Sequence, residues 1–377
     1  MVVTQSAKVG LVLAGGGARA AYQAGVMLAI SHILPDARTN PFPVISGTSA
    51  GAINATGLAC AAHDFRLAAG QLAQLWRQIR IEDVYQADML YFLKTFLHFG
   101  VSIASAGRLW SNPKSFLDNA PLREYLGRVV AFDGIDHAIA SGSLRALALT
   151  ASCFNSGQSV TFFDGAPEVQ AWTRQMRVGV REKIGIDHLM ASSALPLIFP
   201  ATRVGDRYFC DGAVRQMAPL SPALHLGAQK LFVVGLAGNK SATRDGGYPS
   251  PAQVFGHLLN SIFADSMASD MERLIRVNHT VSLLSGHSDL ASQTPLQRVE
   301  VFLINPSASL EDIARKHVHL FPPVLRFLLH GTGATRRRGL SLATYLLFEP
   351  GYCRELIALG YRDVLKQKEA ILNFLEL

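Results

Sequence analysis

A serine stands between two glycines in the pentapeptide Gly-Thr-Ser-Ala-Gly at residues 47–51. The spacing fits the G-x-S-x-G pattern, in which a strand turns sharply into a helix and exposes a serine hydroxyl for attack. Gly47 and Gly51 avoid side chains where neighbouring backbone would collide, and the positive end of the following helix would face Ser49. Ser49 is therefore the candidate nucleophile of an ester hydrolase, although the same five residues also occur as an ordinary turn.

A second cluster lies upstream and consists of three glycines with a nearby arginine: Gly15, Gly16, Gly17 and Arg19. Backbone N–H groups at such a strand-to-helix junction can face a developing negative charge, which predicts an oxyanion hole. The competing interpretation is a nucleotide- or phosphate-binding regulatory module, because Gly15, Gly17 and Ala20 fit the dinucleotide fingerprint G-x-G-x-x-G/A. The acidic residue that this fingerprint needs about 20 residues later is matched only loosely by Asp36.

A carboxylate is offered by the turn Asp211-Gly212-Ala213, which follows the short half-apolar run 207–210. Aspartate–glycine turns at strand ends are usually structural. As a general base, Asp211 would have to lie about 2.6–3.2 Å from the Ser49 hydroxyl, in a partly desolvated pocket that strengthens it as a proton acceptor. If a Ser–His–Asp triad of the α/β-hydrolase type operates instead, three histidines are candidates for the third partner: His63, His188 and His225.

Taken in this order, the three motifs resemble those of the patatin-like phospholipase family. The stretch 191–200 ahead of the aspartate and Pro219 behind it are also similar to the family's pattern, so the resemblance covers about residues 9–227. One position departs from it, since Ala20 stands where a glycine commonly follows the basic residue. This departure bears on substrate class more than on mechanism.

The resemblance implies a Ser–Asp dyad in which Ser49 attacks an ester carbonyl and Asp211 takes its proton, giving an acyl-enzyme. Gly15, Gly16 and Gly17, with Arg19 nearby, would hold the oxyanion. The chain would then be a carboxylic ester hydrolase of the lipase or phospholipase A type. It implies a lipid or other fatty-acyl ester as substrate, and it implies no cofactor and no metal.

Two strand–helix units must position these motifs. The aliphatic runs 9–13 and 42–46 are each followed by a glycine turn and a helical pattern, which indicates a parallel sheet covered on both faces. Further strands are expected at Leu144–Ala151, Val160–Phe163, Tyr208–Cys210, Lys230–Gly235 and Val299–Ile304. We therefore expect an α/β fold, with a mostly parallel central sheet flanked by helices as in the patatin-like α/β/α sandwich.

A linker-like segment, residues 239–251, divides the chain. We expect a catalytic domain over residues 9–227 and a mainly helical extension of open role over residues 240–377, with helices near 252–277 and 353–375. Aromatic residues gather between Arg80 and Asp118, where a helical insertion could form a lid or an acyl-chain wall, or could simply pack on the core.

Composition excludes several classes of protein. With 49% hydrophobic and 17% charged residues the chain is folded and globular. The net charge of +7 is spread thinly, the one tight basic run is 336–338, and no nucleic-acid motif is present, so nucleic acid is not an expected partner. Four scattered cysteines favour neither a metal site nor disulfides. Apolar stretches are too short for a signal peptide or a membrane span, which predicts a cytoplasmic enzyme able to contact membranes peripherally; its oligomeric state is left open.

Overall fold

The structure, a computed structural model, describes residues 8–86, 114–238, 248–284, 296–333 and 340–377, with the single residues 91, 94, 97, 98, 102, 105 and 294 between them. Most of the expected aromatic insertion, the first part of the linker and the basic run 336–338 lie outside the described residues.

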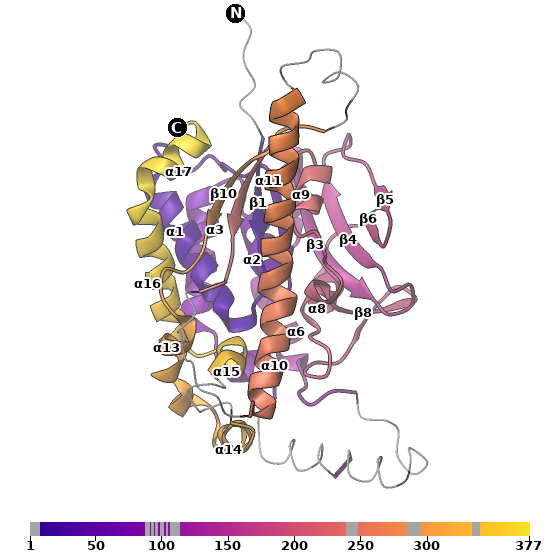
Figure 1. Cartoon of the computed structure of the whole chain (residues 1–377), viewed down its shortest axis with the longest axis vertical. Coiled ribbons are helices and arrows are strands. Elements are labelled where there is room, and N and C mark those ends of the chain that lie inside the picture. The colour runs from indigo at the N-terminus through magenta and orange to yellow at the C-terminus, as the bar shows by residue number, and fades with distance from the viewer. Residues whose placement is uncertain are drawn as a thin grey trace, which may run out of the picture.

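A ten-stranded mixed sheet forms the centre of the described part (Figure 1). Five strands are parallel to one another, in the spatial order β10 (Glu300–Ile304), β9 (Lys230–Val234), β1 (Val9–Leu13), β2 (Val44–Thr48) and β3 (Ala146–Cys153). Beyond β3 lie β4 (Ser159–Gly165), β6 (Arg177–Arg181), β5 (Trp172–Arg174), β8 (Arg207–Asp211) and β7 (Thr202–Val204).

The expected central sheet flanked by helices is confirmed, but beyond β3 the pairing is mixed, since β4 and β6 are parallel to each other and the other pairs are antiparallel. β3 runs antiparallel to both β4 and β8. Only five residues join β3 to β4, and so short a connection allows an antiparallel pairing but not the crossover that a parallel pairing needs. The five parallel strands therefore carry the first two motifs, and the antiparallel strand β8 carries Asp211.

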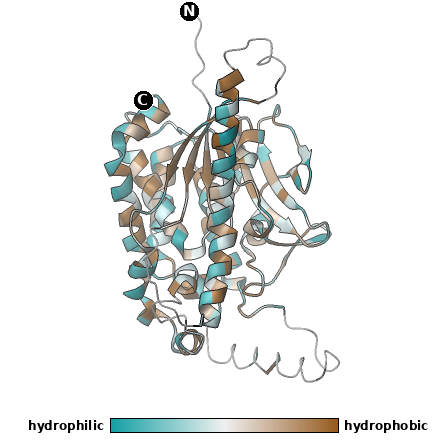
Figure 2. Ribbon diagram, in the orientation of Figure 1, coloured by the Kyte–Doolittle hydropathy of each residue, from teal (hydrophilic) through white to brown (hydrophobic). Residues whose placement is uncertain are grey.

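The parallel strands are apolar on both faces because helices cover both. All five residues of β1 are buried, and Figure 2 shows the strands as the hydrophobic centre of the molecule. Leu11 and Leu13 belong to the larger core cluster, whereas Val12 between them belongs to the second cluster on the opposite face, as the two-residue period of a strand requires.

The larger core cluster includes residues of α1 (Ala21–Ile33), α2 (Ala50–Cys60), α3 (Phe65–Gln78) and α16 (Pro350–Lys366). The second cluster includes residues of α9 (Ser221–His225) and α11 (Ser266–Leu284). Shorter helices connect these layers: η1 (Gly17–Ala20), α4 (Ile81–Val84), α6 (Ala120–Val129), α7 (Asp133–Ala140), α8 (Ile186–Ser193) and η2 (Gly212–Val214).

The C-terminal segment is built into the same fold. β10 extends the sheet beyond β9, and α16 lies along α1, far from it in sequence (Figure 1). Two glycines permit this close approach, since a Cβ at Gly25 would lie 2.1 Å from the Ile357 carbonyl oxygen and one at Gly360 would lie 2.3 Å from that of Tyr22. The expected helix 353–375 is two helices, α16 and α17 (Lys368–Leu375), which are separated at Gln367.

The other expected C-terminal helix, residues 252–277, comprises α10 (Pro251–Asn260), the π-helical turn η3 (Ser261–Asp265) and the first part of α11. The remaining elements are α13 (Leu310–Arg315), η4 (Val318–Leu320), α14 (Pro323–Gly331) and α15 (Leu340–Leu346). Among the described residues, no helix combines the length and the apolarity needed to cross a bilayer.

Candidate active site

Ser49 occupies a sharp elbow between β2 and α2. Its φ of 57° and ψ of −131° are unusual for a residue with a side chain, and only 6% of its surface is exposed. A Cβ at Gly47 would lie 2.2 Å from the Gly51 carbonyl oxygen, and one at Gly51 would lie 2.3 Å from that of Leu13. The two glycines are therefore required by the turn, and the N-terminus of α2 begins directly after the serine.

The elbow is held from the β3 side. The backbone N–H of Ser49 donates to the Ser192 hydroxyl at 2.9 Å, and this hydroxyl donates to the Thr150 carbonyl at 2.7 Å. No sequence motif indicated Ser192, although it lies in the stretch 191–200 that carries part of the resemblance. A serine that fixes another serine's backbone has no spacing signature of its own.

Asp211 is brought to the elbow by strand pairing. β3 lies between β2 and β8, with Thr48 opposite Thr150 and Ala151 opposite Asp211. The aspartate is completely buried, and its Oδ1 accepts a hydrogen bond of 3.0 Å from the Ala213 N–H. The two residues that are far apart in the sequence thus share one buried site.

Burial raises the pKa of Asp211 to about 7, while the Ser49 hydroxyl and the Ala213 N–H partly oppose that rise. Ser49 is therefore close enough to stabilise the carboxylate. Within the described residues, however, Oδ2 makes no hydrogen bond of ordinary geometry, so the Ser49 contact is looser than a full hydrogen bond. Such loose contacts are common in resting enzymes and tighten when substrate binds.

The glycine loop lies against the nucleophile. It connects β1 to η1, and a Cβ at Gly15 would lie 3.0 Å from the Cβ of Ser49. Gly17 has a φ of 56°, which favours glycine. In the part of the chain that the structure describes, the N–H groups of Gly15, Gly16 and Gly17 donate no hydrogen bond, so they are free to meet a negatively charged oxygen.

Arg19 has a different environment from the glycines. Its buried guanidinium donates to Thr344 at 2.6 Å, to Asn260 at 3.0 Å and to the Tyr345 hydroxyl at 3.1 Å. It also lies 3.6 Å from a carboxylate oxygen of Glu311 and stacks 3.9 Å from the centre of the Tyr345 ring. All three guanidinium nitrogens are engaged with the C-terminal segment, so this side chain ties that segment to the loop.

A small apolar cavity of about 50 Å³ adjoins Ser49. One wall comes from α3 and α6, including Trp76 and Leu126. The opposite wall comes from the C-terminal segment and includes Phe263, Tyr345 and Leu346. The sequence could not reveal this second wall, because no motif links residues 263–348 to the serine.

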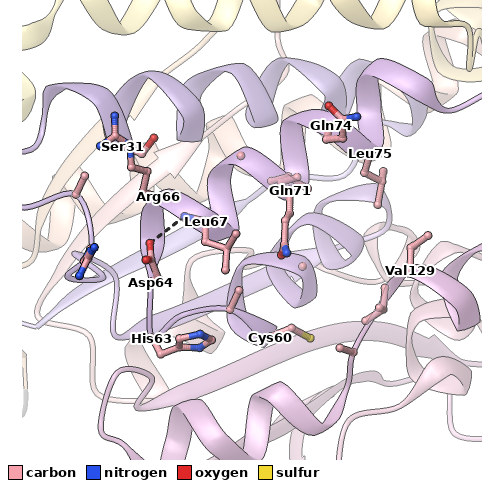
Figure 3. Close-up of a pocket in the computed structure, with 18 of the residues that line it drawn as sticks. Ser31, Cys60, His63, Asp64, Arg66, Leu67, Gln71, Gln74, Leu75 and Val129 are labelled. Atoms are coloured by element: carbon pink, nitrogen blue, oxygen red, sulfur yellow. Dashed lines mark hydrogen bonds between the residues drawn. The ribbon is translucent and has the colours of Figure 1, made fainter.

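A much larger hollow lies elsewhere on the molecule (Figure 3). It measures about 1180 Å³ and is lined by residues that include His63, Asp64, Arg66 and Gln71, but neither Ser49 nor Asp211. The size of this hollow does not make it the reactive centre. Asp211, the carboxyl group whose pKa is strongly raised and which lies beside a serine, is at the elbow instead.

The three candidate histidines are occupied in other ways. His188 is hydrogen-bonded to Glu182 and accepts from the Gly185 N–H, and His225 stacks on Trp172. The ring of His63 packs against that of His137. Across the described ranges, no histidine is hydrogen-bonded to Ser49 or Asp211.

Asp36 does not occupy the position that a dinucleotide site requires. It is exposed in the turn after α1 and accepts hydrogen bonds from the Arg38 N–H and the Thr39 hydroxyl. The ribose-binding carboxylate of a dinucleotide fold follows the second strand instead.

Residues 11–224 match the family model described as patatin-like phospholipase. Since the match covers more than half of the chain, this protein belongs to the patatin-like phospholipase family. No curated protein sequence matches the chain significantly.

Two solved structures are similar in fold. Human GIVD cytosolic phospholipase A2, in complex with methyl gamma-linolenyl fluorophosphonate, is 15% identical with a TM-score of 0.46, and the match covers 98% of this chain and 59% of that one. VipD from Legionella pneumophila is 13% identical with a TM-score of 0.33, and the match covers 93% of this chain and 67% of that one. This chain thus spans 59% of the length of the human structure.

Proposed function

We propose that this enzyme cleaves fatty-acyl esters of lipids through a Ser49–Asp211 dyad and an acyl-enzyme intermediate. One observation carries the proposal: a serine on a strained elbow lines an apolar cavity, and a buried aspartate with a pKa of about 7 and free loop N–H groups lie next to that serine. Each part supplies what acyl transfer requires, namely a nucleophile, a base, an oxyanion site and a place for a hydrocarbon chain.

In the first half-reaction, the Ser49 Oγ attacks the ester carbonyl carbon and its proton passes to Asp211. The carbonyl oxygen becomes an oxyanion, which Gly15, Gly16 and Gly17 would stabilise with their N–H groups. The tetrahedral intermediate collapses, the bond to the alcohol oxygen breaks, and the alcohol leaves with the proton from Asp211. The acyl group remains on Ser49.

In the second half-reaction, water attacks the acyl carbon and gives a proton to Asp211. The bond between the acyl carbon and Oγ breaks, Ser49 regains its proton, and the fatty acid is released. A base with a pKa near neutral suits both steps, because it accepts and returns a proton at little cost.

Hydrolysis of a fatty-acyl p-nitrophenyl ester tests the dyad. We expect Ser49→Ala and Asp211→Asn each to lower kcat by at least about 10³-fold. Ser159→Ala, which removes another buried serine hydroxyl in β4, should retain full activity. The dyad would be refuted if Asp211→Asn were mild while replacement of one histidine abolished the reaction.

We also infer that the enzyme is cytoplasmic and works at lipid surfaces without spanning them. The net charge of +7 favours anionic headgroups, and large apolar side chains such as Leu197 and Met217 are 64% and 81% exposed. Cosedimentation with anionic vesicles, but weaker cosedimentation with neutral ones, is the expected result. Equal absence of binding to both would contradict it.

A further inference from the structure

The cavity at Ser49 is too small for a long acyl chain. At about 50 Å³ it has room for a few water molecules only. Pockets that enclose larger ligands measure roughly 300–1,000 Å³. A long chain attached to Ser49 must therefore extend into a neighbouring space.

A second, larger groove lies behind one wall of this cavity. It measures about 450 Å³, and of its thirteen lining residues only Thr332 is polar. The lining residues come from α10, α14 with the residue after it, α15 and two short stretches between elements, Phe116 with Leu117 and Leu197 with Ile198. We call this the C-terminal groove.

The two spaces adjoin, because they share one lining residue and neighbouring residues of one stretch line each of them. Leu195 and Phe199 line the cavity at Ser49, whereas Leu197 and Ile198, from the same stretch, line the C-terminal groove. Leu346, at the end of α15, lines both spaces. Leu346 is therefore the side chain at which a connection between the two spaces is expected.

The stretch that lines both spaces is also tied to the catalytic base. The Asp211 N–H donates to the Ala194 carbonyl at 2.8 Å, directly before the stretch. The N–H groups of Phe116 and Leu117 donate to the carbonyls of Leu197 and Ile198 at 2.8 and 2.9 Å. The groove is therefore held in a fixed position relative to the reacting atoms.

The large hollow of Figure 3 also borders the cavity, since Ile53 and Leu75 line both. Its other walls carry charged side chains, among them Asp64 and Arg66. A hydrocarbon chain gains free energy by leaving water for apolar walls, and it would desolvate charges in this hollow. The C-terminal groove is the better match for an acyl chain.

We propose that the C-terminal groove is a second acyl-chain compartment, which the substrate's chain reaches past Leu346 and which makes the enzyme selective for long chains. The proposal rests on the proposed function. Because α10, α14 and α15 lie outside the residues 11–224 that match the family model, the selectivity would be a property of the C-terminal segment.

Filling the groove tests the proposal. Leu328 lines it from α14, so Leu328→Trp places a larger side chain inside; Phe327→Trp, at the exposed neighbouring position outside the lining, is the matched control. The measurement is kcat/KM for p-nitrophenyl esters from acetyl to palmitoyl. Each methylene buried in the groove should raise kcat/KM about fourfold, so kcat/KM of wild type should increase steeply with chain length until the groove is full.

Leu328→Trp should leave acetyl ester hydrolysis within about twofold of wild type and lower palmitoyl ester hydrolysis by roughly 15–60-fold, which corresponds to the loss of two to three buried methylenes. Phe327→Trp should match wild type at every length. Leu346→Ala, which removes the shared side chain, should raise the preference for long chains. This second variant keeps the proposal testable if Leu328→Trp does not fold.

Other outcomes would overturn it. If Gln71→Trp, in the hollow of Figure 3, shortened the accepted chain while Leu328→Trp did not, the chain would run the other way. A loss of vesicle binding in Leu328→Trp with an unchanged chain-length profile would make the groove a membrane contact. Ester hydrolysis that depends on Ser49 but has the same kcat/KM from acetyl to palmitoyl would refute the groove alone. Absence of Ser49-dependent hydrolysis of any ester would instead refute the proposed function.

Discussion

Replacing Asp211 by asparagine should remove activity and, above neutral pH, make the protein more stable. The carboxyl is fully buried, and its pKa of about 7 compares with 3.8 for a free aspartate. An unfolded chain therefore ionises this group at a lower pH than the folded protein does. Between about pH 4 and pH 7 the folded wild type keeps this proton while the unfolded chain loses it. The free energy of unfolding of wild type therefore decreases as the pH rises through this range.

The size of the effect follows from the shift. A difference of about three pKa units corresponds to about 4 kcal/mol at 1.36 kcal/mol per unit. Below about pH 4 the carboxyl is neutral in both states, so its ionisation has no effect there. Above about pH 7 the full cost is present, and the asparagine variant avoids it. For a chain of 377 residues, 4 kcal/mol is roughly 5 °C in the midpoint of thermal unfolding.

Thermal unfolding of wild type and Asp211→Asn at pH 4.5, 6 and 8 measures this effect. The advantage of the variant should grow by several degrees from pH 4.5 to 8. Asp206→Asn is the matched control, because that side chain is 92% exposed and should show no such trend. If the stability of Asp211→Asn relative to wild type did not depend on pH, Asp211 would not be desolvated in the folded protein. The argument that burial makes Asp211 a base would then be refuted.

Three further results are expected. For wild type, kcat/KM should fall about tenfold per pH unit below the Asp211 pKa of about 7, because the base must be deprotonated in the free enzyme; a profile flat from pH 5 to 8 would contradict this. Arg19→Met should lower the free energy of unfolding by about 3 kcal/mol in denaturant titrations, since it leaves the buried partners of the guanidinium unpaired, whereas the exposed Arg66→Met should change it by less than about 0.5 kcal/mol. Gly47→Ala should lower the free energy of unfolding by at least about 3 kcal/mol and abolish activity, because its Cβ would contact backbone. Gly70→Ala in α3, where a Cβ meets nothing within 4 Å, should raise the free energy of unfolding by about 0.5–1 kcal/mol. Similar effects of the two substitutions would refute the elbow geometry.

The parallel strands were predictable from the sequence because their burial on both faces leaves continuous apolar runs. β1, β2, β3 and β9 fall within a few residues of the runs that indicated them. β5 and β7 were not predicted, since each has only three residues and none of these is buried, so neither carries a hydrophobic pattern. The change to antiparallel pairing at β3 depends on a short connection whose effect appears only in three dimensions.

The motifs of the site were predictable in the same limited sense. The glycines at the elbow indicate a turn that excludes side chains, and Gly15 to Gly17 indicate a loop that exposes N–H groups. The C-terminal wall of the cavity was not predictable, because Phe263 and Tyr345 reach Ser49 through tertiary packing alone. Arg19 illustrates the same limit: its position beside the loop suggested an oxyanion role, while its hydrogen bonds are made to the C-terminal segment.

The dyad is tested most directly by the rate and site of covalent modification by a fluorophosphonate, followed by mass spectrometry of the peptides. We expect modification at Ser49, about ten times faster at pH 8 than at pH 6 because Asp211 has a pKa of about 7, and slowed by at least about 10³-fold in Asp211→Asn. Modification of another serine, or of Ser49 at one rate in wild type and Asp211→Asn, would contradict the account.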